Sequence, residues 1–206
     1  MYKVLVLPFK QMPSAEDFLT QEEKRYCQTL KIEKRRQDYL AGRYALKKLL
    51  SDNFVKADYK SIEILKHEDG RPLLFINGVK SNLNVSISHS NAYACACAGR
   101  GCLVGVDIER VEERSEAWRN FSFAKEEITE TSPEFLTALW AKKEAVLKLL
   151  GLGLSVDMHS IRFDNDRMYL EGKLKEKQNS LGAAVISTDL SYTNGFAVAV
   201  AYSKVV

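Results

Sequence analysis

The chain has 206 residues, of which 46% are hydrophobic, so it can bury a substantial core in one large domain or two small ones. This composition excludes disordered and fibrous proteins. The formal net charge of +3 is far below the basic excess expected of a protein whose main partner is nucleic acid. Any anionic ligand must therefore be bound by a local cluster of basic residues.

The sequence predicts a cytoplasmic protein without a membrane partner. The apolar run within residues 1–10 is too short for a signal peptide, and no later run approaches the roughly 20 apolar residues of a membrane span. The cysteines have no further Cys or His at the spacing of a zinc site, so we interpret them as buried, reduced thiols. They are Cys27, Cys95, Cys97 and Cys102.

The N-terminal half begins with a predicted strand at Val4–Leu7, followed by a helical region that becomes a long basic helix over residues 31–50. Most of its lysines and arginines are expected on a solvated face. Arg43 differs, because Ala41 and Gly42 before it leave room for a ligand or another backbone. A strand at residues 62–65 and a turn that holds Arg71 before a proline come next.

Three antiparallel strands are then predicted in succession, at residues 83–88, 93–98 and 103–108. The first ends at Ser88 and His89. A lone histidine at a strand end is more often a surface side chain than a ligand, so its position alone does not indicate a site.

The third strand carries the sequence VGVDIE, in which an apolar run ends in two carboxylates. Asp107 and Glu109 are two residues apart, so on a strand they point to the same face. This arrangement lets one strand offer two oxygen ligands to one hard cation.

The C-terminal half is predicted to continue with a charged, loop-like stretch at residues 111–120 and helices at 125–131 and 134–150. Glu144 and Lys148 lie one turn apart on the second helix, where such a pair is more often a solvated ion pair. Lys143 falls within the apolar stripe of this helix, where a lysine needs a path to solvent or an anionic partner.

The remaining residues predict β-structure, and one strand repeats an earlier pattern. The predicted strands lie at 161–163, 168–170, 184–188 and 196–202. FAVAVA at 196–201 matches YACACA at 93–98, at an offset of 103 residues, which is half of the chain. We therefore predict an α+β fold made of a pseudo-twofold pair of similar lobes, residues 1–103 and 104–206, each with a small antiparallel sheet packed on a long helix.

The candidate site combines carboxylates with basic residues. Asp107, Glu109 and Glu144 without His or Cys indicate magnesium, or possible manganese, rather than zinc. The basic residues suited to holding phosphates are Arg43, Arg71, His89, Lys143 and Lys148. The combination points to phosphoryl-type transfer, although no P-loop, kinase glycine loop or dinucleotide fingerprint is present in the sequence.

At these residues the sequence resembles the 4'-phosphopantetheinyl transferases, in particular their larger two-lobed branch. GVDIE at Gly105–Glu109 and WAKKEAVLK at Trp140–Lys148 match the two signature motifs of that family. Further matching segments are NVSISHS at Asn84–Ser90, GRP at Gly70–Pro72, AGR at Ala41–Arg43, GLGLS at 151–155 and FAVAVA at 196–201. The resemblance covers nearly the whole chain, and the joint order of the motifs is specific.

The resemblance implies an enzyme that transfers the 4'-phosphopantetheine arm of coenzyme A to a serine of an apo acyl or peptidyl carrier protein, releasing adenosine 3',5'-bisphosphate. It implies Mg2+ held by Asp107, Glu109 and Glu144, with coenzyme A as co-substrate. Glu144 would also act as general base and Lys148 would stabilise charge in the transition state. The implied coenzyme A phosphate contacts are Arg43, Arg71, Ser88, His89 and, more weakly, Lys143.

Two features depart from the family. Some members carry lysine at the position of Arg71, and the connection over residues 111–133 looks short, which bears on the docking of the carrier. We expect a monomer with pseudo-dimeric lobes. The alternative function is a non-catalytic module on the same scaffold that binds coenzyme A or a nucleotide, or docks carrier proteins. A broken metal site would indicate that alternative, and all three carboxylates are present in the sequence.

Overall fold

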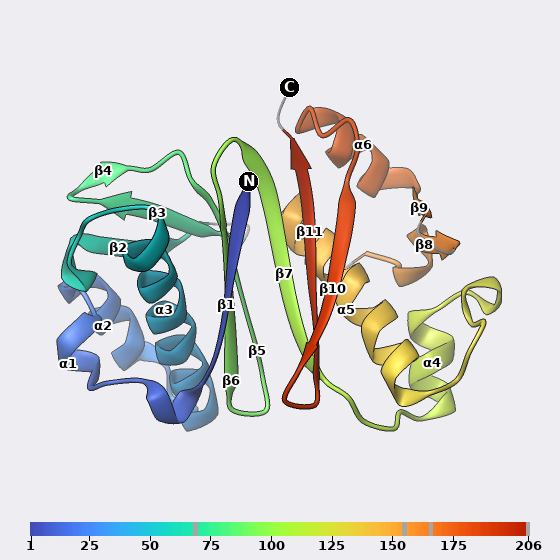
Figure 1. Cartoon of the computed structure of the whole chain (residues 1–206), viewed down its shortest axis with the longest axis horizontal. Helices are drawn as coiled ribbons and strands as arrows, with labels where there is room; N and C mark the ends of the chain where they lie inside the picture. Colours follow the sequence, from blue (N-terminus) through green and yellow to red (C-terminus); the bar gives the residue numbers. More distant parts are fainter. Residues whose placement is uncertain (68–69, 154–155, 165–166, 205–206) are drawn as a thin grey trace. The chain divides into compact units, whose positions relative to one another are not determined.

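The computed structural model describes residues 1–67, 70–153, 156–164 and 167–204, and it contains two compact units, Met1–Val104 and Gly105–Val206. The elements up to the boundary are β1 (Tyr2–Pro8), η1 (Phe9–Gln11), α1 (Ala15–Phe18), α2 (Gln21–Thr29), α3 (Glu33–Asn53), η2 (Tyr59–Ser61), β2 (Ile62–Lys66), β3 (Pro72–Ile76), β4 (Val79–Lys80), β5 (Asn84–Ser90) and β6 (Tyr93–Gly99). β7 (Cys102–Arg110) crosses the boundary (Figure 1). The later elements are α4 (Glu116–Ser122), η3 (Lys125–Glu127), α5 (Pro133–Leu150), η4 (Met158–Ser160), β8 (Ile161–Asp164), β9 (Arg167–Leu170), α6 (Gly172–Ser180), β10 (Ser187–Thr193) and β11 (Phe196–Lys204).

The N-terminal unit is built on a sheet of order β1-β6-β5, in which β6 pairs antiparallel with both neighbours. Helix α3 packs on β6, and small side chains such as Ala94 and Ala96 at 0% exposure allow this close approach. A second sheet of order β2-β3-β4 packs its apolar residues into the same core, among them Ile62 and Ile64.

The C-terminal unit repeats this plan with a sheet of order β10-β11-β7 and helix α5 packed on β11 (Figure 1). The hairpin β10–β11 turns through Asn194 and Gly195, and the hairpin β5–β6 turns through Asn91 and Ala92; all four residues have positive φ, as two-residue hairpin turns of this type require. The predicted α+β class, with two similar lobes that each pack a small antiparallel sheet on a long helix, is confirmed.

Several predicted elements differ from the structure. Of the three strands predicted in succession, the third, β7, pairs with β11 and not with β6. Helix α4 begins within the stretch 111–120 that was expected to be a loop and ends at Ser122, and only a short 3-10 turn, η3, stands where residues 125–131 were expected to be helical. The strand expected at 184–188 begins at Ser187, and α6 was not expected at all, because Leu174 is the only apolar residue that it buries.

Parts of two predicted segments lie outside the described residues. They are residues 68–69, in the turn before Arg71, and residues 154–155, in the GLGLS segment.

Helix α5 has the capping signals that its sequence contains. The Ser132 side chain accepts a hydrogen bond from the Phe135 amide, and Pro133 occupies the first turn. Gly151 ends the helix in the left-handed conformation, with φ of 69°. These caps define where α5 starts and stops, and so where its polar side chains project.

Gly105 allows β7 to cross α5 at backbone contact. A Cβ atom added there would lie 2.0 Å from the carbonyl oxygen of Ala145 and 2.4 Å from the amide nitrogen of Leu149. Only glycine permits this approach, which lies two residues before Asp107.

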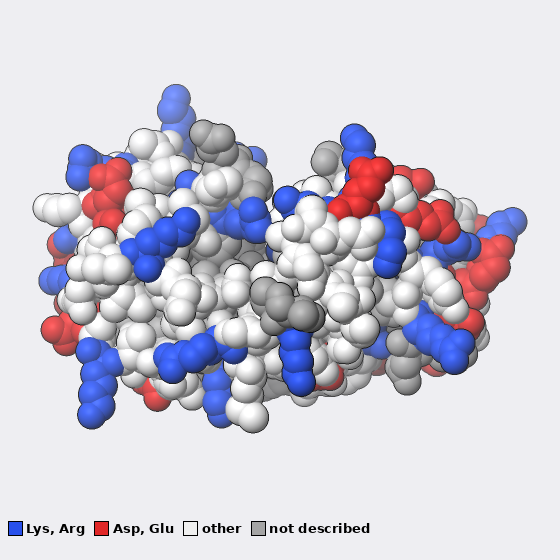
Figure 2. Space-filling view, turned by 90° about the horizontal axis from the view of Figure 1, so that it is seen from above, with Lys and Arg blue, Asp and Glu red and all other residues white. Residues whose placement is uncertain are grey.

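The described part of the chain contains no helix that is long and apolar enough to span a membrane. On the face seen in Figure 2, lysines and arginines are scattered among neutral and acidic residues and do not form one continuous basic stripe. This distribution agrees with the small net charge.

We predict that Gly105→Ala lowers the free energy of unfolding by about 3 kcal/mol, because strand and helix backbones must separate to admit the methyl group. Urea unfolding followed by circular dichroism measures this change. Gly153→Ala is the matched control, since a Cβ atom there meets no atom of the described residues within 4 Å. Equal destabilisation by the two variants would contradict the close approach.

Candidate functional site

Strand β7 and helix α5 bring Asp107 and Lys148 into direct contact within the C-terminal unit. Asp107 is 3% exposed, and its Oδ1 atom lies 2.6 Å from Nζ of Lys148. Lys148 lies one turn after Glu144 on α5, and it is partly exposed. The ion pair that the sequence suggested between Glu144 and Lys148 is therefore replaced by one between Lys148 and the strand carboxylate.

Glu144 has an unusual protonation equilibrium. Burial raises its pKa to about 7, the nearby Asp107 and Glu109 carboxylates raise it as well, and Lys148 opposes them. Its Oε1 atom is buried and has no hydrogen-bond partner among the described residues. A carboxyl group with a pKa near neutrality is suited to accept a proton from a substrate hydroxyl.

The carboxylates offer the oxygen donors that magnesium prefers, and the buried Oε1 of Glu144 fits a role as a cation ligand. Within the part of the chain that the structure describes, however, no three His, Cys, Asp or Glu side chains are gathered closely enough to hold a metal ion. Lys148 already neutralises Asp107 in this arrangement. Magnesium binding by Asp107, Glu109 and Glu144 therefore stays a prediction.

Arg114 contacts Glu109 from the segment after β7, and sequence reasoning did not identify it. Its Nη2 atom lies 3.6 Å from Oε2 of Glu109, and its Nη1 atom lies 3.0 Å from Oε1 of Glu112. Its guanidinium stacks 5.2 Å from the Trp118 ring centroid, and Trp118 in turn packs on Trp140 of α5. The only sequence signal was an arginine five residues after a predicted ligand.

Lys143 lies in the core and does not have a donor left for a phosphate. It is 0% exposed, and its Nζ atom donates to the carbonyl oxygens of Ser122 and Met158 and to Oε2 of Glu127, at 2.9, 3.0 and 2.8 Å. Oε1 of Glu127 accepts the amide of Phe163. The expectation that Lys143 contacts coenzyme A is therefore corrected, because three acceptors take the three protons of its ammonium group.

Lys47 on α3 makes the same contacts in the N-terminal unit, although it was expected on a solvated face. Its Nζ atom lies 2.5 Å from Oε2 of Glu23 and also donates to the carbonyl oxygens of Phe18 and Tyr59. Oε1 of Glu23 accepts the amide of Ile64, as Oε1 of its C-terminal counterpart accepts a strand amide. We call this arrangement the buried lysine brace. In the sequence, the only signal of this brace is a lysine on the apolar side of each long helix.

The predicted phosphate-binding residues of the N-terminal unit lie on α3 and β5 and at the start of β3. The guanidinium of Arg43 lies 4.2 Å from the Tyr39 ring centroid and donates to the carbonyl oxygen of Ile64, and its Nε atom is buried without a hydrogen bond to the described residues. His89 on β5 lies 3.6 Å from Asp38 on α3, which links the two elements.

Ser88 and Arg71 are placed less directly. Ser88 precedes His89 on β5 and is buried, at 4% exposure. Arg71 is partly buried and directly precedes β3. Their binding of coenzyme A stays a prediction.

Two family models match the chain. The model of the "4'-phosphopantetheinyl transferase superfamily" matches residues 103–201, and that of the "4'-phosphopantetheinyl transferase N-terminal domain" matches residues 22–99. The first match contains β7 and α5 with the acidic cluster, and the second contains α3 and β5 with Arg43 and His89. No curated protein matches the chain significantly.

Solved structures of holo-acyl-carrier-protein synthases are distantly similar. The enzyme of Bacillus anthracis str. Ames, in complex with CoA (3',5'-ADP), is 23% identical over 47% of this chain and 91% of that chain, with a TM-score of 0.41. The synthase of Thermotoga maritima is 29% identical over 57% and 70%, with a TM-score of 0.39. That of Helicobacter pylori, in complex with coenzyme A, is 22% identical over 48% and 97%, with a TM-score of 0.38. Because these TM-scores are low, family membership rests on the two family models.

We predict that Lys143→Ala lowers the free energy of unfolding by about 3–5 kcal/mol, because the carboxylate of Glu127 is left buried without its counter-charge. Lys142→Ala, the adjacent change on the same helix, should cost less than about 1 kcal/mol, since Lys142 is only partly buried. Urea unfolding of the ligand-free protein compares the two. If Lys143→Ala kept full stability and lost only affinity for coenzyme A, this result would contradict the structural role, and Lys143 would again be assigned as a coenzyme A contact.

Proposed function

Because the chain belongs to the 4'-phosphopantetheinyl transferase superfamily and is therefore a transferase, we propose that it moves the 4'-phosphopantetheine moiety of coenzyme A to a serine of an acyl or peptidyl carrier protein. Adenosine 3',5'-bisphosphate is the second product. The observation that carries this proposal is the cluster of buried Asp107 with the partly buried Glu144 and Lys148 within the matched region.

The cluster supplies the groups that phosphoryl-type transfer requires. The serine hydroxyl oxygen attacks the phosphorus that carries the pantetheine arm, and the bond from this phosphorus to the bridging oxygen of the pyrophosphate breaks. The bridging oxygen and its electron pair leave with adenosine 3',5'-bisphosphate. Glu144 takes the proton of the serine hydroxyl. Lys148 stabilises the negative charge that develops on the phosphates.

Asp107, Glu109 and Glu144 would hold Mg2+ in this proposal. The ion, when bound, supplies positive charge to the pyrophosphate of coenzyme A. The fit rests on an all-oxygen donor set and on the buried, unsatisfied Oε1 atom of Glu144. Arg114 orients Glu109 from the side through its ion pair.

In the N-terminal unit, we assign the phosphates of coenzyme A to Arg43, Arg71, Ser88 and His89. The Nε atom of Arg43 is a buried donor that its hydrogen bond to Ile64 leaves available. Stacking on Tyr39 fixes the plane of its guanidinium, which favours two parallel hydrogen bonds to a phosphate. His89 would add charge when its imidazole is protonated.

Labelling of an apo carrier protein tests the proposal. Incubation with coenzyme A and magnesium should add the mass of the phosphopantetheine arm to the carrier, as read by mass spectrometry. Glu144→Gln should slow this transfer by at least about 100-fold, since it removes the proton acceptor and keeps the side-chain shape. Asp107→Ala should slow it similarly, because the partner of Lys148 is lost.

Glu134→Gln, an exposed change on the same helix, should transfer at the wild-type rate. If the wild-type chain labelled no carrier of the fatty-acid, polyketide or peptide-synthetase class, this result would contradict the proposal. Tight coenzyme A binding in that case would establish the alternative of a non-catalytic binding module.

A further inference from the structure

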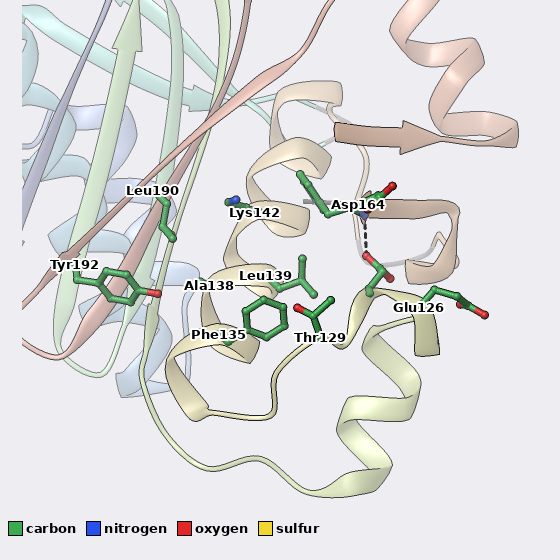
Figure 3. A pocket seen from close by; sticks show the side chains of 11 residues that line it. Glu126, Thr129, Phe135, Ala138, Leu139, Lys142, Asp164, Leu190 and Tyr192 are labelled. Atoms are coloured by element: carbon green, nitrogen blue, oxygen red, sulfur yellow. Dashed lines mark hydrogen bonds between the residues drawn. The ribbon is translucent and has the colours of Figure 1, made fainter. Parts of the chain in front are cut away.

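The C-terminal unit contains a pocket of about 200 Å³ that the proposed reaction does not use (Figure 3). Leu190 and Tyr192 of β10 line one side, and Phe135 and Leu139 of α5 lie next to them (Figure 3). The other lining residues are Glu126, Glu127, Thr129, Ala138, Lys142, Phe163 and Asp164. This volume suits one aromatic ring with a short chain and is smaller than that of a typical cofactor site.

The buried lysine brace aligns the two long helices residue by residue. Lys47 and Lys143 make equivalent contacts, so positions four residues before them correspond. Arg43 then corresponds to Leu139. At eight residues before each lysine, Tyr39 corresponds to Phe135.

The hairpins align in the same way. Counting back from the equivalent two-residue turns places His89 of β5 at the register position of Tyr192 of β10. A contact confirms the match: His89 lies against Asp38 of α3, and the Tyr192 hydroxyl donates to the carbonyl oxygen of Glu134 of α5. Asp38 and Glu134 each precede the brace lysine by nine residues.

The pocket is therefore the counterpart of the region that holds Arg43 and His89. Both basic side chains are replaced there, by Leu139 and by Tyr192. The tyrosine stacked under Arg43 becomes Phe135, which keeps the ring and loses the hydroxyl. A position built for an anion in one unit is apolar and aromatic in the other.

The charges around the pocket are mainly negative. The acidic lining residues are Glu126, Glu127 and Asp164, of which Glu126 and Asp164 are exposed at its rim, and Lys142 is the one cationic residue that lines it (Figure 3). Burial raises the pKa of Tyr192, and Glu134 and Glu130 raise it as well. Such surroundings disfavour a phosphate and favour a cation.

We propose that this pocket binds a small aromatic ammonium compound, with the ring against Phe135, Leu139 and Leu190 and the ammonium group toward the carboxylates. Apolar contact with the ring and attraction of the cation to the aromatic faces and carboxylates would both contribute. The site is separate from the proposed coenzyme A contacts. The comparison of this pocket with an anion site around Arg43 and His89 rests on the proposed function. The choice of an aromatic ammonium ligand rests on the residues that line the pocket.

Phenethylamine and phenylacetate form a matched pair of probes, since they share a ring and a short chain and differ in charge. The methyl resonances of Leu139 and Leu190 in the full chain should shift saturably on titration with phenethylamine. The same titration should show that phenylacetate binds with at least about tenfold lower affinity. Phe135→Ala should lower the affinity for phenethylamine by about tenfold as well. Val185→Ala, which truncates an exposed side chain outside the pocket, should leave this affinity unchanged. Saturating coenzyme A should not displace the amine.

Equal or tighter binding of phenylacetate would overturn the proposal. So would displacement by coenzyme A, or no saturation by phenethylamine up to about 10 mM, which corresponds to roughly 0.3 kcal/mol per non-hydrogen atom. These readouts do not use carrier labelling, so failure of the proposed transfer would leave them unaffected.

A second variant tests the replacement directly. Leu139→Arg combined with Tyr192→His restores the two basic residues. The affinity for phenethylamine should therefore fall by about tenfold, and the affinity for phenylacetate should rise by about tenfold. Calorimetry with adenosine 3',5'-bisphosphate should then detect a weak additional site. An unchanged amine preference in this double variant, folded by circular dichroism, would contradict the correspondence.

Discussion

A buried lysine paired with a buried glutamate organises each unit. Moving an ammonium group out of water costs several kcal/mol, and Lys47 and Lys143 offset that cost because each donates to one carboxylate and two carbonyl oxygens. Glu23 and Glu127 also accept a strand amide. One polar centre thus ties a long helix, the segment before it and a neighbouring strand together. In the C-terminal unit it fixes the rotation of α5, which carries Glu144 next in sequence.

The same scaffold supports different chemistry in the two units. The N-terminal unit places cationic Arg43 on α3, against Tyr39 and Ile64 of β2, whereas in the C-terminal unit Asp107 and Glu109 of β7 lie near Glu144 of α5. Gly105 permits that crossing, and the Asp107–Lys148 ion pair follows from it. The two units share a framework, and equivalent positions on it carry different side chains. Where α3 has Arg43, α5 has Leu139, which lines the apolar pocket.

The sequence was sufficient for the features that depend on periodicity. The strand with Asp107, the helix with Glu144 and the duplication all follow from apolar spacing, and the structure has them. Such patterns could not identify the partner of Lys143. The apolar stripe left open a path to solvent or an anionic partner, and that anion could be a phosphate or a carboxylate. Glu127 lies in a 3-10 turn within residues 125–131, which were expected to be helical, and that expectation gave no reason to pair it with Lys143. Helix α6 was missed for a related reason, since a helix that buries little apolar surface leaves no stripe to read.

The central claim is that the side-chain carboxyl group of Glu144 has a pKa near neutral pH. A cation or a substrate that binds next to it can then displace its proton. A carbon-13 NMR titration of its side-chain carboxyl group, with and without saturating Mg2+, tests this directly. The account predicts a pKa of about 7 in the metal-free protein, set mainly by burial and by repulsion from Asp107. Magnesium should lower that pKa by at least about 2 units, because positive charge next to the carboxylate favours its ionised form. An ordinary glutamate pKa without metal, or a pKa that magnesium leaves unchanged, would contradict the account.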